Sequence, residues 1–181
     1  MELKKFLEQL KAKSIELRID DNDKLVYRDA KKFITQSEEE HLKQNEQQIL
    51  EILRKGDFIS KTYPLSLGQE ALWLIYKMAP ESPAYNIIFA PFRIKAELDI
   101  EVLKQAFQAL TNRHACLRTL FAEEKDGKAI QNVCAYKEAV FEQINASGWT
   151  EEKLKQKVKA AYKLPFNLEK KPPVRFHLFT L

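Results

Sequence analysis

The apolar residues of this chain change their spacing from one segment to the next, and this change constrains the fold more than any other feature. Residues 3–10 place an apolar side chain every three or four positions, which is typical of one face of a helix. A period of two follows at residues 15–19 and 25–28, on either side of the polar turn 20–23. Segments of both periods continue to residue 181, so the sequence predicts a mixed α/β (α+β) fold.

Residues 1–56 are predicted to form a small unit of their own. After the first helix and the hairpin, Ser37 and Glu40 have the spacing of a capping box, in which each side chain satisfies a free N–H of the other's backbone. Gly56 fits the residue that ends a helix. The predicted order is therefore helix, hairpin, and one or two helices. Residues 57–62 are predicted to be a short linker that is too short and too apolar to be flexible.

An isolated hairpin has a free edge, and fifty-odd residues build only a thin core. The edge can take up an added strand from a partner. Around the hairpin, four basic residues oppose only Asp29, which leaves a local excess of +3 that suits an acidic, extended peptide. Alternatively, the lysines merely protect the edge against aggregation, and the residues alone do not decide between the two. The candidate partner-binding residues are Arg18, Lys24, Tyr27, Arg28, Lys31 and Lys32.

From residue 63 the chain is predicted to alternate helices with strands. Capping residues Ser66, Asp99 and Thr150 each precede a helical pattern. The expected strands are 85–96 (interrupted near Pro91), 117–122, 129–136, 140–144 and 174–181, with a turn at 125–128. Because the last run stops at the final residue without a turn, we expect the fold to be incomplete.

The composition excludes several kinds of site. The four glycines are isolated, so no glycine-rich phosphate loop can be formed. The three histidines lack a second ligand at metal-binding spacing, and two cysteines are too few for a disulfide framework. Basic residues are interspersed with acidic ones, which argues against nucleic acid as a partner. The chain has no apolar run long enough to span a membrane and no secretory signal, so the cytoplasm is expected.

Two stretches resemble a known family. Residues 66–73 (SLGQEALW) are similar to the first core motif of condensation domains of nonribosomal peptide synthetases, Ser-x-Ala-Gln-x-Arg-(Leu/Met)-Trp, with Gly68 and Ala71 as departures. Residues 113–121 (RHACLRTLF) resemble the second motif, Arg-His-Glu-x-Leu-Arg-Thr-x-Phe, with Ala115 in place of Glu. Residues 166–168 and 173–175 look like the stretch that leads to the third motif.

The resemblance implies a chloramphenicol-acetyltransferase-like lobe over residues 63–181. It also implies a reaction in which a carrier-bound thioester forms an amide with a carrier-bound amine, the phosphopantetheine being held by the partner carrier proteins and no cofactor by this chain. The family's catalytic signature, His-His-x-x-x-Asp-Gly, does not occur, so we expect no catalytic residue and no condensation by this chain alone.

The motif residues are most simply interpreted as structural. Ser66, Gln69 and Trp73 fit a cap, its partner and a core aromatic residue. Arg113, His114 and Arg118 are expected to make structural hydrogen bonds, and Arg118 is the better candidate for shaping an active-site neighbourhood.

Residues 1–56 resemble the N-terminal docking domain of tubulysin-type synthetases, which also runs helix, hairpin, helices before a condensation domain. This resemblance implies a bacterial assembly line, an upstream subunit whose acidic C-terminal tail binds the hairpin, and a homodimer formed by pairing of two docking domains as an option. The alternatives are the start of a complete synthetase, a stand-alone acetyltransferase-like protein, and an interaction module without catalysis.

Overall fold

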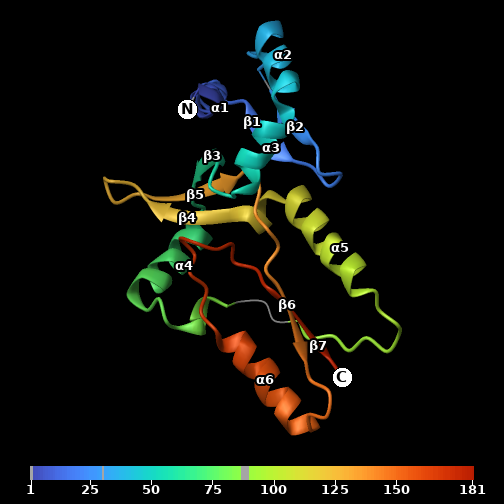
Figure 1. Ribbon diagram of the computed structural model, residues 1–181. Coiled ribbons are helices and arrows are strands. Elements are labelled where there is room, and N and C mark those ends of the chain that lie inside the picture. Colours follow the sequence, from blue (N-terminus) through green and yellow to red (C-terminus); the bar gives the residue numbers. More distant parts are fainter. Residues whose placement is uncertain (1, 30, 87–89) are drawn as a thin grey trace.

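The N-terminal part of the chain forms a helix, a β-hairpin and two more helices, as predicted, in a computed structural model that describes residues 2–29, 31–86 and 90–181. Its elements are α1 (Glu2–Ala12), β1 (Glu16–Ile19), β2 (Leu25–Arg28), α2 (Gln36–Gln44) and α3 (Glu46–Arg54). Strands β1 and β2 pair antiparallel (Figure 1). Gly56 follows α3 with a φ of +75°, which confirms it as the residue that ends the helix.

A single apolar cluster holds this part together. It collects side chains from the first helix, the hairpin and the last two helices, and all are nearly inaccessible to water: Leu7, Leu10, Ile15, Leu17, Ile19, Leu42, Ile49, Leu50 and Leu53. Burying a leucine or isoleucine stabilises a fold by about 1.5–3 kcal/mol. Ala135, from far along the chain, belongs to the same cluster. The N-terminal part therefore shares its core with the part that follows.

The capping box of α2 lies two residues earlier than predicted. Thr35, with an extended backbone, is the N-cap, and its hydroxyl accepts a hydrogen bond from the Glu38 N–H at 3.3 Å. The Glu38 carboxylate accepts from the Thr35 N–H at 2.9 Å, whereas Ser37 lies inside the first turn. The sequence contains both spacings, and Lys13 of the α1–β1 turn favours the earlier one because its ammonium binds Glu38 at 2.6 Å.

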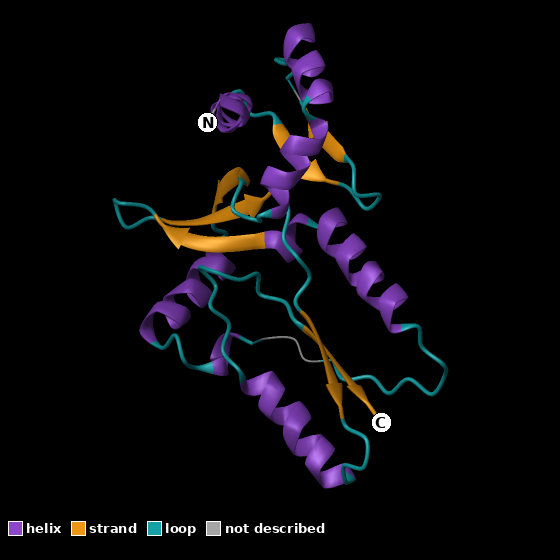
Figure 2. Ribbon diagram, viewed as in Figure 1, coloured by secondary structure: helices purple, strands orange, loops and turns teal. Residues whose placement is uncertain are grey.

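The second part contains the remaining five strands and three α-helices of the described residues. These are β3 (Ile59–Pro64), α4 (Leu67–Met78), α5 (Ile100–Arg113), β4 (Thr119–Glu123), β5 (Ala129–Cys134), β6 (Phe141–Asn145), α6 (Glu151–Lys163) and β7 (Phe176–Thr180). Strands β3, β5 and β4 form an antiparallel sheet in that order, and β6 pairs parallel with β7 through α6. The three-stranded sheet lies between the N-terminal part and the remaining helices (Figure 2).

The predicted helix starts are confirmed in this part. Ser66 and Gln69 form a reciprocal capping box, and the side chains of Asp99 and Thr150 accept hydrogen bonds from the first turns of α5 and α6. The capped helix α4 presents Trp73 and Tyr76 to a second apolar cluster, which also contains Leu65, Tyr85 and Leu168. Capping fixes the direction of α4 and thereby the position of these aromatic rings.

Two predictions of local structure are wrong. The predicted linker 57–62 instead contributes β3, whose Thr62 lies opposite Asn132 of β5, because a partner strand seventy residues away cannot be read from local composition. The predicted strand 85–96 is also not formed where the structure describes it. Pro83–Tyr85 is a 3₁₀ turn, residues 90–96 are irregular and exposed, and residues 87–89 lie outside the described residues. Pro91 cannot donate to a strand ladder.

Candidate functional site

The hairpin has one packed face and one mixed face. Leu17 lies opposite Tyr27, and Ile19 lies opposite Leu25, so these four side chains share the face toward the helices. Leu17 and Ile19 are buried, and the Tyr27 hydroxyl donates to the Glu39 carboxylate of α2. This hydrogen bond raises the pKa of Tyr27. The hairpin is thereby held against α2 and α3.

The outer edge of β1 is covered by the second part of the chain. The Ile19 N–H donates to the Ala135 carbonyl at 3.3 Å. At the start of β1, the Lys61 ammonium pairs with the Glu16 carboxylate, which raises the pKa of Lys61. The Asn112 amide of α5 donates to the Asp20 carbonyl at 3.0 Å. The edge that remains open is therefore that of β2.

The outer edge of β2 presents the main chain of two residues. The Asp20 N–H donates to the Lys24 carbonyl at 2.9 Å, so by alternation the main chains of Leu25 and Tyr27 point away from β1. The Leu25 N–H meets the Glu46 carboxylate at 3.4 Å. The Tyr27 N–H has no partner in the described part of the chain, and no described strand pairs with this edge. Such an edge can accept an added strand.

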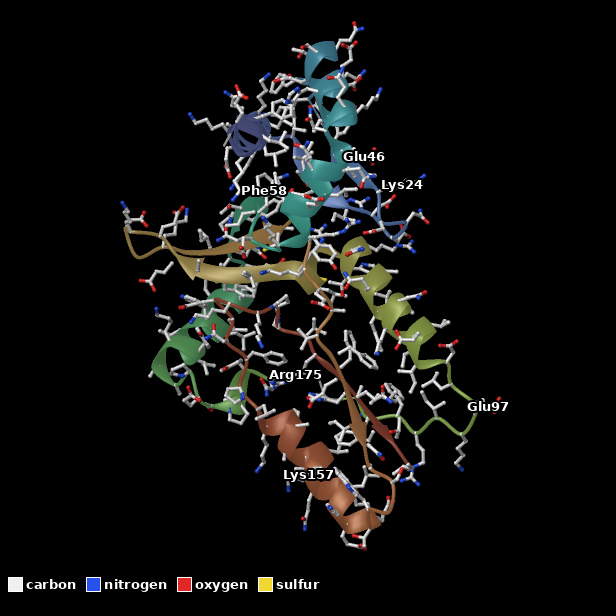
Figure 3. All side chains as sticks on the ribbon, in the orientation of Figure 1. Lys24, Glu46, Phe58, Glu97, Lys157 and Arg175 are labelled. Atoms are coloured by element: carbon white, nitrogen blue, oxygen red, sulfur yellow. The ribbon has the colours of Figure 1, made fainter. Side chains whose placement is uncertain are left out.

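The predicted docking residues are brought together, with one exception. Tyr27 and Arg28 are on β2, Lys24 precedes it, and Lys31 and Lys32 lie in the exposed loop that follows. Figure 3 labels Lys24 beside Glu46 on this side of the molecule.

Arg18 is the exception, since it lies on β1 and faces the second part of the chain. Burial lowers the pKa of Arg118, and the nearby Arg18 cation lowers it further.

The loop after β2 is positively charged because Arg28, Lys31 and Lys32 outnumber its single acid, Asp29. The Asp29 carboxylate accepts from the Ile34 N–H at 2.8 Å, and this bond lowers the pKa of Asp29. Arg28, Lys31 and Lys32 have no ion pair among the described residues. Phe33, half exposed beneath the Lys31 ammonium, was not singled out from the sequence because no periodic pattern includes it.

The motif residues of the second part divide into buried and exposed ones. The side chain of Gln69 bonds Gln131 of β5 at 3.2 Å, and Trp73 stacks at 6.4 Å between ring centroids on Phe121. Arg118 is buried and donates to the Cys134 carbonyl. Arg113 and His114, at the end of α5, are exposed.

An apolar cavity of about 790 Å³ lies beneath Trp73. Its wall is mainly apolar and includes the aromatic residues Tyr85, Phe107 and Phe176, the last two stacked at 3.8 Å between ring centroids. His177 of β7 is also on the wall, with its Nδ1 at 3.1 Å from the Glu142 carboxylate. A cavity of this kind can bind an apolar group. Among the described residues, no group of three His, Cys, Asp or Glu side chains is placed to hold a metal ion, and no helix could cross a membrane.

The comparisons with known proteins give the family of the second part. The condensation-domain family model matches residues 59–181. The chain belongs to the condensation-domain family. The match begins inside the segment predicted as a linker, at the first residue of β3, in agreement with the role of that strand in the sheet.

Curated relatives of this condensation-family chain are very large synthetases. The chain is 34% identical over 118 residues to the dimodular nonribosomal peptide synthase of Bacillus subtilis, which covers 65% of this chain and 5% of the relative. It is 29% identical over 187 residues to bacitracin synthase 2 of Bacillus licheniformis, which covers 97% of this chain and 7% of the relative. The chain thus spans only a small fraction of the relatives it matches.

Solved structures agree with the family at the level of the fold. The first condensation domain of the calcium-dependent antibiotic synthetase, in complex with a substrate analogue, superposes with a TM-score of 0.55 at 21% identity, over 67% of this chain and 30% of that one. The starter condensation domain of rhizomide synthetase gives a TM-score of 0.54 at 21% identity, with 67% and 29% covered. The mixed α/β fold is thus that of the chloramphenicol-acetyltransferase-like condensation domains.

Proposed function

We propose that this chain is the N-terminal part of a nonribosomal peptide synthetase subunit, in which residues 1–56 dock the C-terminal tail of an upstream subunit. The observation that carries the proposal is the outer edge of β2, which lies open beside Arg28, Lys31 and Lys32. Strand addition supplies main-chain hydrogen bonds, and the basic loop selects an acidic tail.

The condensation-family part supports a proposal for the chemistry that docking would serve. In the proposal it belongs to a unit that transfers the acyl group of one carrier-bound thioester to the amine carried by a second carrier protein. The new amide C–N bond replaces the donor's C–S bond, and the thiol of the donor's phosphopantetheine arm is released. The apolar cavity under Trp73 supports this proposal because it offers room for an apolar acyl group. The docked tail then decides which upstream carrier reaches the unit.

Pairing of two docking domains is a separate proposal that stands beside the first. Among the described residues, the β1 edge contacts the second part of the chain, so pairing would use the β2 edge and would compete with the tail. Sedimentation of the chain with and without a tail peptide tests this, since a tail-sensitive dimer is expected if both use β2.

Calorimetric titration with C-terminal peptides from candidate upstream subunits tests docking. The double variant Arg28→Glu/Lys32→Glu is expected to weaken binding about five- to thirtyfold, given up to about 1 kcal/mol for each exposed pair, and raised salt to weaken binding to the unchanged protein. The control is Lys4→Glu/Lys5→Glu, which makes the same change of net charge on the exposed face of α1. Equal weakening by both double variants would contradict a local site, and unchanged binding in the first would contradict the charge pairing.

A further inference from the structure

The open edge of β2 has opposite charge at its two ends. At the hairpin turn, acidic residues outnumber basic ones. The acidic residues are Asp20, Asp21, Asp23 and Glu46, and the basic residues are Lys24 and Arg54. Arg54 is already paired with Asp23 at 2.5 Å. At the other end, the basic residues outnumber the unpaired acidic ones. The basic residues are Arg28, Lys31 and Lys32, and the acidic ones are Asp29 and Glu39, which binds the Tyr27 hydroxyl. Glu38 is not counted because it is paired with Lys13. A strand that binds this edge therefore meets negative charge at one end and positive charge at the other.

Glu46 is the acidic residue that acts directly on the edge. It is the first residue of α3, a helix fixed on the hairpin by the buried Ile49 and Leu53. Its carboxylate reaches the outward-facing Leu25 N–H at 3.4 Å. Because the helix holds its backbone in place, Glu46 remains next to this end of β2 when its carboxylate releases the Leu25 N–H.

An added strand must take over the hydrogen bond that Glu46 now makes. A main-chain carbonyl of the partner can replace the carboxylate at the Leu25 N–H, which leaves Glu46 negatively charged and next to the partner's side chains at that position. An acidic side chain there is repelled, whereas a neutral or basic one is accepted. The same strand gains from acidic side chains near Arg28.

We propose that Glu46 is a specificity residue of the docking edge. It admits strands whose acidic residues lie at the end beside Arg28, Lys31 and Lys32 and whose residues beside Leu25 are neutral or basic. The inference rests on the proposed docking function and adds to it a rule for the partner: the acidic residues of the tail are confined to one end of its strand. Tails that are acidic at both ends bind less tightly than tails that are acidic at one end.

Three capped synthetic peptides test the rule, each with a central stretch of alternating Val and Thr. One has acidic residues at one end, one has them at both ends, and one has none. The unchanged protein is expected to bind the first most tightly. Glu46→Gln keeps an acceptor for the Leu25 N–H and is expected to strengthen binding of the peptide with two acidic ends by about two- to fivefold, the range of one exposed charge pair. Glu51→Gln, an exposed change on the same helix, is the control and is expected to change nothing.

A spin label at the acidic end of the first peptide gives a readout of position. It should broaden the amide signals of residues 31–33 and leave those of residues 21–23 sharp. If the peptide with two acidic ends binds the unchanged protein as tightly as the first, or if Glu46→Gln has no effect, the role of Glu46 is refuted while docking stands. If no acidic peptide binds better than the neutral one, the proposed docking function itself fails.

Discussion

Removing the amide of Asn112 should loosen the contact between the two parts of the chain. Its Nδ2 donates to the Asp20 carbonyl at 3.0 Å, and its Oδ1 accepts from Gln108 at 2.8 Å. Gln108 also donates to the Lys137 carbonyl, so it keeps one partner when Asn112 is lost. The bridge therefore ties the hairpin turn to α5 and to the segment after β5.

The expected cost follows from burial and from the partners left behind. Asn112 is 5% exposed, and Asn112→Ala leaves one Gln108 hydrogen without a partner, while the Asp20 carbonyl keeps the Asp23 N–H at 3.2 Å. A buried group left unpaired costs about 1–3 kcal/mol. Because the Asp20 carbonyl keeps one partner and Asp20 is only half-buried, we expect about 1–2 kcal/mol of lost stability, at the lower end of that range.

Urea unfolding followed by circular dichroism measures this loss, with Gln105→Ala as the exposed control on the same helix. Hydrogen exchange adds a local readout, since the Ile19 amide, which donates to Ala135, should exchange faster in Asn112→Ala than in the control. A loss below about 0.5 kcal/mol, the usual effect of a surface substitution, together with unchanged exchange at Ile19, would refute the bridge between the two parts.

Two further predictions concern the helix caps. The Lys13 ammonium, and to a smaller extent the Thr35 backbone N–H, lower the pKa of Glu38 from its ordinary 4.5. The Glu38 carboxylate therefore contributes fully to the stability of the fold above pH 4.5, and this contribution is lost as the pH falls through the lowered pKa. Glu38→Gln should therefore cost about 0.5–1 kcal/mol at pH 7 and little once Glu38 is protonated, and a cost that does not fall in acid would contradict the ion pair. Ser66→Ala should cost about 0.5–2 kcal/mol in thermal unfolding because it removes the cap of α4, with the exposed Ser147→Ala as the control; equal effects would argue against the cap.

Local chemistry in the sequence predicted the elements that depend on neighbouring residues. The hairpin follows from alternation around residues 20–23, and the helices capped by Asp99 and Thr150 follow from hydroxyl or carboxylate side chains placed before an apolar period. The condensation motifs predicted the family because they specify more residues, in a fixed order, than the pattern of a single helix or strand does.

Elements that depend on distant residues could not be predicted. Local composition predicts a linker at residues 57–62 because the partner of β3 in the sheet, β5, is contributed by residues 129–134. The sequence does not distinguish Ser37 from Thr35 as the cap of α2, because each has a glutamate three residues later. Lys13 favours Thr35 only in the folded chain.

The candidate site was predicted only in part, for the same reason. The basic residues around the hairpin can be recognised in the sequence. Only the structure shows that they lie at one end of the β2 edge and that acidic residues lie at the other. That end includes Glu46, which reaches Leu25 from a helix that begins eighteen residues after β2 ends. Likewise, contacts with distant residues, such as those of Ile19 with Ala135 and of Glu16 with Lys61, show which edge of the hairpin is open.

Amide exchange at Tyr27 tests the central claim most directly. Its N–H faces outward from β2 and has no partner among the described residues, so a bound tail that adds a strand must protect it. On titration with an acidic tail peptide, the Tyr27 amide is predicted to slow markedly, while the already paired Ile19 amide changes little. Binding that leaves Tyr27 exchanging as fast as in the free protein would contradict docking at the β2 edge.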